Sequence, residues 1–146
     1  KICVLCPDAG FLKAFVGGLR TLPGMELAGQ LEALRQGFGL IGTLKLSENF
    51  LFDWMLLPVE PRLKPLWHPL GVGMVGGLVL KYDLDDQGFY RLNLMTHELS
   101  QHAGIPLIQM DPDAEGADMP SRVRTTVTRL LLQIAGLGQD EGASPP

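Results

Sequence analysis

The turn at residues 6–10 is the part of this chain whose residue types and spacing come nearest to phosphate chemistry. Its sequence, CPDAG, joins a strand-like apolar run at residues 2–5 to a stretch with apolar residues at helical spacing. A glycine turn between a strand and a helix lets backbone N–H groups close on a phosphate at the helix N-terminus. The intact loop reads G-x-x-x-x-G-K-[ST]. Here Cys6 takes the place of the first glycine, and Phe11 and Leu12 take the places of the lysine and the hydroxyl residue.

The two cysteines, Cys3 and Cys6, form a C-x-x-C pattern, which is the spacing of redox pairs and of zinc half-sites. An odd separation along a strand points the two side chains to opposite faces, and no second pair completes a zinc site. We therefore expect buried free thiols, which behave as small hydrophobes, and no metal or cofactor. Free thiols indicate a reducing compartment, so the expected location is the cytoplasm.

Composition narrows the class of protein. The chain has 146 residues, of which 46% are hydrophobic and 19% are charged, and its formal net charge is −4. We expect one domain over residues 1–137, followed by a disordered tail at 138–146. No Lys/Arg cluster is present, so no nucleic-acid partner is expected. The longest apolar run, residues 71–80, has about half of the roughly 20 residues that a membrane span needs, so we expect no membrane insertion.

The strands and helices that position the turn at residues 6–10 can be predicted from the alternation of strand-like and helix-like patterns along the chain. Such alternation predicts an α/β fold with three layers, in which a mostly parallel sheet of five strands is covered on both faces. The polar turn SEN at 47–49 joins two strand-like runs into one antiparallel edge hairpin. Residues 25–37 leave two interpretations open, a short strand with a helical turn or a mobile loop. Strands are expected at 2–6, 38–46, 50–60, 75–83 and 105–110, and helices at 10–21, 61–70, 89–103 and 123–134.

This order of elements resembles that of small Ras-like GTPases, most closely the bacterial type that acts in gliding motility and cell polarity. The resemblance covers roughly residues 1–115. Residues 1–19 resemble the first strand, phosphate loop and helix; residues 38–61 resemble the hairpin that carries switch I into switch II. Residues 62–86 resemble the switch II helix with the next strand, and residues 102–114 resemble the strand that leads to the guanine-specificity motif. The resemblance implies a small-GTPase-like, P-loop NTPase-like topology.

Carried over residue by residue, the family's nucleotide-binding motifs are damaged in this chain. The aspartate and the glycine of switch II fall on Pro58 and Pro61, and Pro61 has no N–H for a γ-phosphate. Of the base-reading motif N-K-x-D, Asp113 alone matches. We therefore expect no catalytic residue and no nucleotide cofactor. The vestigial pocket that the resemblance implies consists of Asp8, Gly10, Phe11, Leu12, Pro58, Pro61 and Asp113.

The resulting hypothesis is a pseudo-GTPase, a signalling module that binds a protein partner and neither binds nor hydrolyses GTP. Four prolines between residues 58 and 69 restrict the counterpart of switch II. We expect this segment to present Leu63, Leu66 and Trp67 to an unidentified protein; the alternative is that Leu66 and Trp67 pack on the sheet. The sequence also leaves room for a homodimer.

Two other functions stay open. One is an active small GTPase with atypical motifs. The other is a degenerate receiver domain of a response regulator, whose phosphorylated aspartate should end the third strand, where this chain has Pro58. A second strand antiparallel to the third would favour the GTPase-like fold over the receiver.

Overall fold

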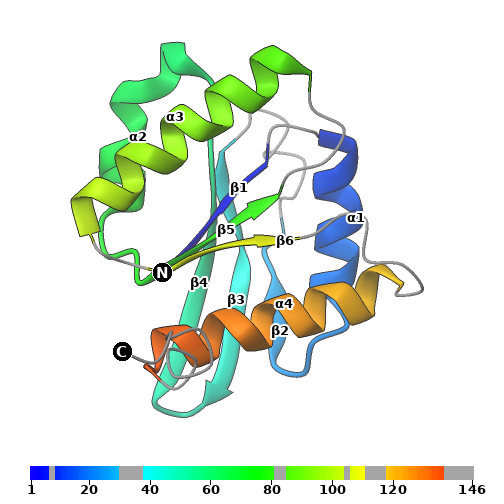
Figure 1. Ribbon diagram of the computed structural model, residues 1–146. Helices are drawn as coiled ribbons and strands as arrows, with labels where there is room; N and C mark the ends of the chain where they lie inside the picture. Colours follow the sequence, from blue (N-terminus) through cyan, green and yellow to red (C-terminus); the bar gives the residue numbers. More distant parts are fainter. Residues whose placement is uncertain (7–8, 30–37, 81–84, 104–105, 111–117, 137–146) are drawn as a thin grey trace, which may run out of the picture.

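The computed structural model describes residues 1–6, 9–29, 38–80, 85–103, 106–110 and 118–136, which form an α/β fold (Figure 1). Strands and helices alternate along most of the chain, as the sequence pattern predicts. The strands are β1 (Ile2–Leu5), β2 (Met25–Leu27), β3 (Gly39–Ser47), β4 (Phe50–Leu57), β5 (Gly76–Leu80) and β6 (Leu107–Met110). The helices are α1 (Ala9–Leu19), α2 (Lys64–Gly71), α3 (Asp86–Ala103) and α4 (Met119–Ile134), and a short 3-10 helix, η2 (Pro61–Leu63), precedes α2.

The described strands form one mixed sheet in the order β2-β3-β4-β1-β5-β6. The pairs β4–β1, β1–β5 and β5–β6 are parallel, whereas β2–β3 and β3–β4 are antiparallel. The expectation of five strands is therefore wrong, because the sheet has six. The additional strand is β2, which lies in the segment for which two interpretations were open.

Strand β2 forms because the chain turns sharply just before it. Gly24 has a φ of 83°, a conformation that residues with a side chain rarely adopt. Its carbonyl accepts a hydrogen bond from the Lys45 N–H at 2.9 Å, and the Ala28 N–H donates to the Ile41 carbonyl at 2.9 Å. These two bonds tie β2 to the outer side of β3.

The hairpin β3–β4 is antiparallel, as its sequence predicts. In the turn between the strands, the Asn49 N–H donates to the Ser47 hydroxyl at 3.3 Å. Strand β4 ends at Leu57, three residues before the expected end at residue 60. Pro58 explains the earlier end, because proline has no N–H to give to a strand ladder.

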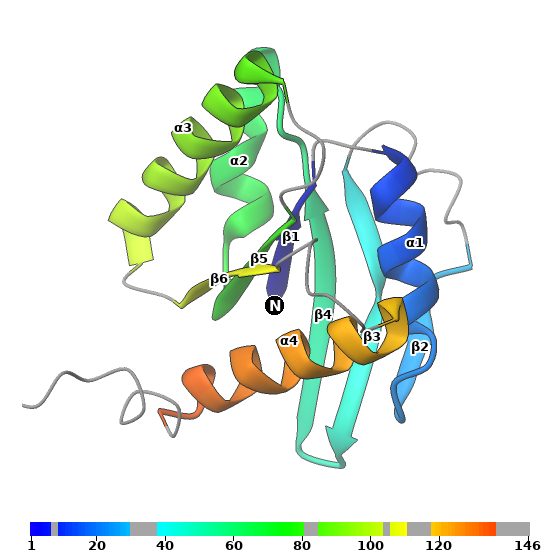
Figure 2. The same cartoon turned by 45° about the vertical axis from the view of Figure 1, so that its right-hand side comes forward.

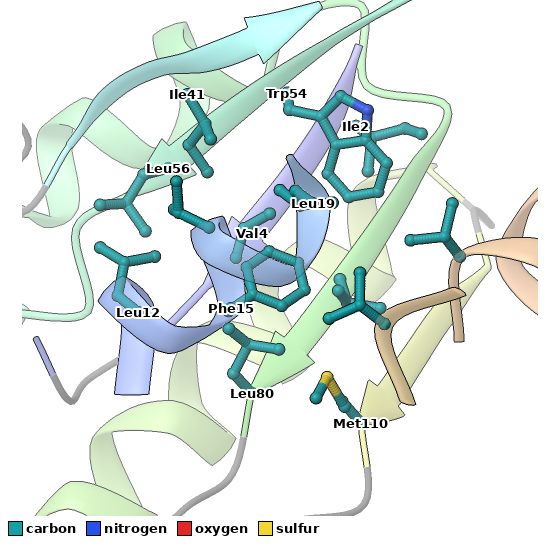
Figure 3. Packing of buried hydrophobic residues seen from close by; sticks show 14 of the residues in the cluster. Ile2, Val4, Leu12, Phe15, Leu19, Ile41, Trp54, Leu56, Leu80 and Met110 are labelled. Atoms are coloured by element: carbon teal, nitrogen blue, oxygen red, sulfur yellow. The ribbon is translucent and has the colours of Figure 1, made fainter. Parts of the chain in front are cut away.

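The helices cover the two faces of the sheet in pairs (Figures 1 and 2). Helices α1 and α4 lie on one face, and α2 and α3 lie on the other. The side chains of β1 alternate between these layers, as side chains of a strand do. Ile2 and Val4 pack in the cluster under α1 and α4 (Figure 3), whereas Cys3 and Leu5 pack in the cluster under α2 and α3.

Helix α4 sits unusually close to its neighbours because glycines lie beneath it. A Cβ atom at Gly18 of α1 would stand 2.6 Å from Cγ2 of Val123, and one at Gly76 of β5 would stand 2.8 Å from Cδ1 of Ile134. The N-cap Asp118 accepts a hydrogen bond from the Ser121 N–H at 2.8 Å. Gly136, with a φ of 78°, follows the helix, as the sequence predicts for its stop.

Candidate functional site

The end of the sheet at which β1 and β4 finish is where this fold would place a ligand. Strand β1 lies between β4 and β5, and the chain leaves it through α1 on one face and reaches β5 through α2 on the other. In open α/β sheets, ligands bind outside the carboxyl ends of the strands at such a reversal of strand order. Leu5 pairs with Leu57, so Cys6 and Pro58 continue two neighbouring strands at the same edge. The two segments whose sequences were expected to resemble a phosphate loop and switch II therefore meet here.

The start of α1 differs from a phosphate-binding turn. The helix already begins at Ala9, so Gly10 lies in its first turn. Phe11 and Leu12 are 6% and 8% exposed, and both belong to the apolar cluster under α1 and α4. In Figure 3, Leu12 points toward the sheet residues of this cluster rather than along the helix axis. The two residues in the places of the lysine and the hydroxyl are therefore part of the hydrophobic core.

The structure says less about the other residues that were expected to form a vestigial pocket. Asp8 and Asp113 lie outside the described residues, so the structure does not place them. Pro58 is buried directly after β4, and Pro61 is the first residue of η2. The structure thus brings Pro58, whose ring is apolar, to the edge at which β1 ends.

Trp67 is the residue for which the structure overturns an expectation about function. Its side chain is 3% exposed and packs in the cluster under α2 and α3, which includes Leu92 and Met95. Its indole N–H donates a hydrogen bond of 2.6 Å to the carbonyl of Pro58. A ring enclosed in this way cannot be presented to a partner, so the expected anchor role of Trp67 is corrected to core packing. Leu63 and Leu66 remain half-buried on η2 and α2.

Further contacts hold the segment that contains Trp67. The Leu63 N–H donates to the Glu60 carbonyl at 2.9 Å, and Arg62 forms an ion pair with Glu60. Lys64 of α2 forms an ion pair with Glu98 of α3. Ion pairs this exposed stabilise a protein little, so the buried Trp67 side chain is the main attachment of the segment.

The two cysteines lie on opposite sides of the sheet, as their odd spacing predicts. Cys3 is buried under α2 and α3, whereas Cys6 packs against the cluster under α1 and α4. Neither forms a disulfide bond. Burial raises the pKa of Cys3 to about 11, because it disfavours the thiolate. Cys3 is therefore a neutral core residue and not a nucleophile.

A group of exposed apolar side chains at the tip of the β3–β4 hairpin was not predicted from the sequence. Leu46, Phe50 and Leu51 are each more than half exposed at the tip of the β3–β4 hairpin. Figures 1 and 2 show that this tip extends beyond α4. The available signal is that apolar residues flank the polar turn on both sides, and that Phe50 and Leu51 are consecutive, so that both faces of β4 carry an apolar side chain at the tip.

Within the described ranges, no group of three or more His, Cys, Asp or Glu side chains could hold a metal ion. The helices in those ranges are also too short or too polar to cross a membrane. No protein-family model matches the sequence, and a comparison with curated proteins found no match either. The geometry at the ends of β1 and β4 is thus the basis on which a function can be assigned.

Proposed function

We propose that this chain is a pseudo-GTPase, a GTPase-like module that regulates a protein partner and does not bind or hydrolyse GTP. The sheet order supports a small-GTPase-like topology. With β2 set aside as an added edge strand, the remaining order β3-β4-β1-β5-β6 has one antiparallel hairpin followed by parallel strands. That arrangement is the one the resemblance implies.

The observation that carries the proposal is the burial of Phe11 and Leu12. Binding of Mg²⁺ and GTP needs a cation on the β- and γ-phosphates and a hydroxyl on the metal. At the two matching positions this chain has apolar side chains that pack beneath α1. A lysine placed at position 11 in the same direction would bury its charge, which is costly without a partner. This burial counts against an active GTPase with atypical motifs.

The antiparallel hairpin counts against the receiver-like alternative. A receiver domain has a doubly wound sheet of parallel strands in the order 2-1-3-4-5. In this chain, Gly39–Ser47 runs antiparallel to Phe50–Leu57 over the whole hairpin. The position directly after β4, at which a receiver would carry its phosphorylated aspartate, is Pro58 in this chain.

The contacts that hold α2 against the sheet support a protein in which this segment keeps one conformation. In a working GTPase, switch II orders and relaxes with the γ-phosphate. Here the segment is held by the hydrogen bond from Trp67 to Pro58 and by the restriction that its prolines impose. We propose that Leu63 and Leu66, which keep part of their side chains exposed, contribute to a surface for a protein partner that is always available.

Calorimetric titration with GTP, GDP and ATP, with and without Mg²⁺, tests the nucleotide half of the proposal. We expect no binding tighter than about millimolar, a free energy of roughly −4 kcal/mol. Binding in the micromolar range that depends on Mg²⁺ would contradict the proposal.

A fluorescence titration tests the fixed segment directly. In a Trp54→Phe variant, Trp67 is the single tryptophan and reports on the segment itself. We expect its emission to stay unchanged at millimolar GTP and Mg²⁺. An emission change that saturates with nucleotide would mean that the segment still responds as a switch. A variant with Trp67→Phe instead, in which Trp54 reports from the other face, serves as the control for effects outside the segment.

A further inference from the structure

The outer edge of β6 offers backbone hydrogen-bonding groups to a further strand. Strand β6 ends the sheet order, and its described partner is β5. The Gly77 N–H donates to the Pro106 carbonyl at 2.9 Å, so Pro106 faces β5. Because alternate residues of a parallel strand bond to opposite sides, Ile108 also faces β5, whereas Leu107 and Gln109 direct their N–H and C=O groups outward.

A contact from α4 agrees with this assignment. Nη2 of Arg129 donates to the Gln109 carbonyl at 3.2 Å. The carbonyl therefore points away from β5, toward the side on which the described part of the chain supplies no strand. The same contact shows which face of α4 adjoins this edge.

The pattern of β6 is complementary to itself. If two copies pair antiparallel about a two-fold axis at Ile108, Leu107 of each copy lies opposite Gln109 of the other. Residues that face each other in this way exchange both N–H···O bonds. The strand sequence LIQM has no charged side chain, so no like charges are brought together.

The opposite edge of the sheet lacks this complementarity. In β2, the residues before and after Glu26 would direct their backbone groups outward, so the equivalent two-fold axis would pass through Glu26. Two exposed carboxylates would then face each other, and like charges directly opposite destabilise a strand pair. The Met25 N–H is also already bonded to the Leu22 carbonyl at 3.2 Å. A second copy is therefore favoured at β6 and disfavoured at β2.

An exposed leucine lies beside the β6 edge. Leu132 is 43% exposed and follows Arg129 by three residues, which places the two on the same face of α4. In a two-fold pair this side chain would contribute apolar area next to the strands. We expect a pair of four-residue strands with one leucine beside it to bury less than the roughly 800 Å² per partner of a standard stable interface, so the affinity should be modest.

We propose that a second copy of this chain pairs with β6 in an antiparallel, two-fold arrangement centred on Ile108, with Leu132 of α4 in contact across the axis. The two sheets would then be continuous. Arg129, which holds the Gln109 carbonyl in the single chain, would share that oxygen with the Leu107 N–H of the second copy.

Sedimentation equilibrium over a range of protein concentrations, about 1 μM to 1 mM, tests the proposal. We expect a monomer–dimer equilibrium for the unaltered chain. Leu132→Glu should weaken dimerisation at least about tenfold, because it places two carboxylates near the axis. Leu46→Glu is the matched control, because Leu46 is similarly exposed, at 52%, but lies at the hairpin tip. That control should dimerise like the unaltered chain.

A second variant tests the strand pairing itself. Gln109→Pro removes the outward N–H without touching the bonds to β5 and should abolish dimerisation, whereas Gln109→Thr keeps the N–H and should not. If Gln109→Pro does not fold, amide exchange of the unaltered chain decides instead, since exchange at Leu107 and Gln109 should slow as concentration rises. A chain that stays monomeric throughout, or a dimer that is weakened by Leu46→Glu and not by Leu132→Glu, would overturn the proposal.

Discussion

The two tryptophans lie on opposite faces of the sheet, and both are buried, but they are held in different ways. Trp67, under α2 and α3, donates its indole N–H to the Pro58 carbonyl. Trp54, under α1 and α4, is fully buried, and its indole N–H has no hydrogen-bond acceptor among the described residues. The face that carries α2 and α3 is thus fastened by a specific polar contact, whereas the other face depends on close apolar packing.

Removal of either ring is expected to have the largest effect. Trp54→Ala and Trp67→Ala should each lower the free energy of unfolding by about 3–5 kcal/mol, because each leaves a large cavity in a core. Urea denaturation monitored by circular dichroism measures both. A small loss for Trp67→Ala would mean that its ring is not part of the core, and the comparison between the faces would fail.

Replacement by phenylalanine sharpens the comparison. Both Trp→Phe changes replace the indole by a smaller phenyl ring. Trp67→Phe also leaves the buried Pro58 carbonyl without its hydrogen-bond donor. We expect Trp67→Phe to cost about 1–3 kcal/mol more than Trp54→Phe, which is the penalty for an unsatisfied buried polar group. Equal losses in the same denaturation assay would show that the hydrogen bond contributes nothing.

Two adjacent glycines of α1 test the close packing on the other face. Gly18→Ala should lower the free energy of unfolding by about 1–3 kcal/mol, because the new methyl group would stand 2.6 Å from Val123. Gly17→Ala should instead raise it by about 0.5–1 kcal/mol, because no atom lies within 4 Å of the new methyl group and alanine favours the helix. Changes of the same sign at both positions would contradict close packing of α4 on α1.

At neutral pH, the smallest effect on the free energy of unfolding is expected from the ionisation of the Cys3 thiol. Burial raises the pKa of this thiol to about 11 in the folded state, above its value in the unfolded chain. The folded state therefore keeps the proton longer, and the contribution of Cys3 to stability is complete below the unfolded pKa and is lost as the pH rises toward 11. Unfolding measured across alkaline pH should show a steeper loss for the unaltered chain than for Cys3→Ala. Parallel profiles for the two proteins would argue that the thiol does not titrate in this way.

The parts of the fold that the sequence predicts are those with long periodic patterns. The hairpin, α3 and α4 each carry a pattern that repeats several times and an identifiable turn or stop, such as Gly136. Strand β2 has three residues, too few for an alternation to be recognised, and it depends on the φ of Gly24 and on bonds to β3. The end of β4 follows from Pro58, because proline has no N–H to give to a strand ladder.

The candidate site was predictable only in part. The apolar types of Phe11 and Leu12 predict the loss of phosphate binding, whereas their packing in the core is seen only in the structure. The burial of Trp67 could not be assigned, because it depends on a backbone carbonyl nine residues away and on α3, which comes later in the chain. The complementarity of β6 likewise requires the register with β5, which no local pattern contains.

The close contact between Gly18 of α1 and helix α4 also affects the order in which parts of the protein can fold. Gly18 and Val123 lie against each other although about a hundred residues separate them in the sequence, and contacts this distant form slowly. During synthesis, the part of α1 around Gly18 that packs against α4 stays uncovered until the ribosome has released α4. A factor that shields hydrophobic nascent chains would therefore have its longest opportunity to bind at α1, whereas the β3–β4 hairpin can form as soon as it emerges.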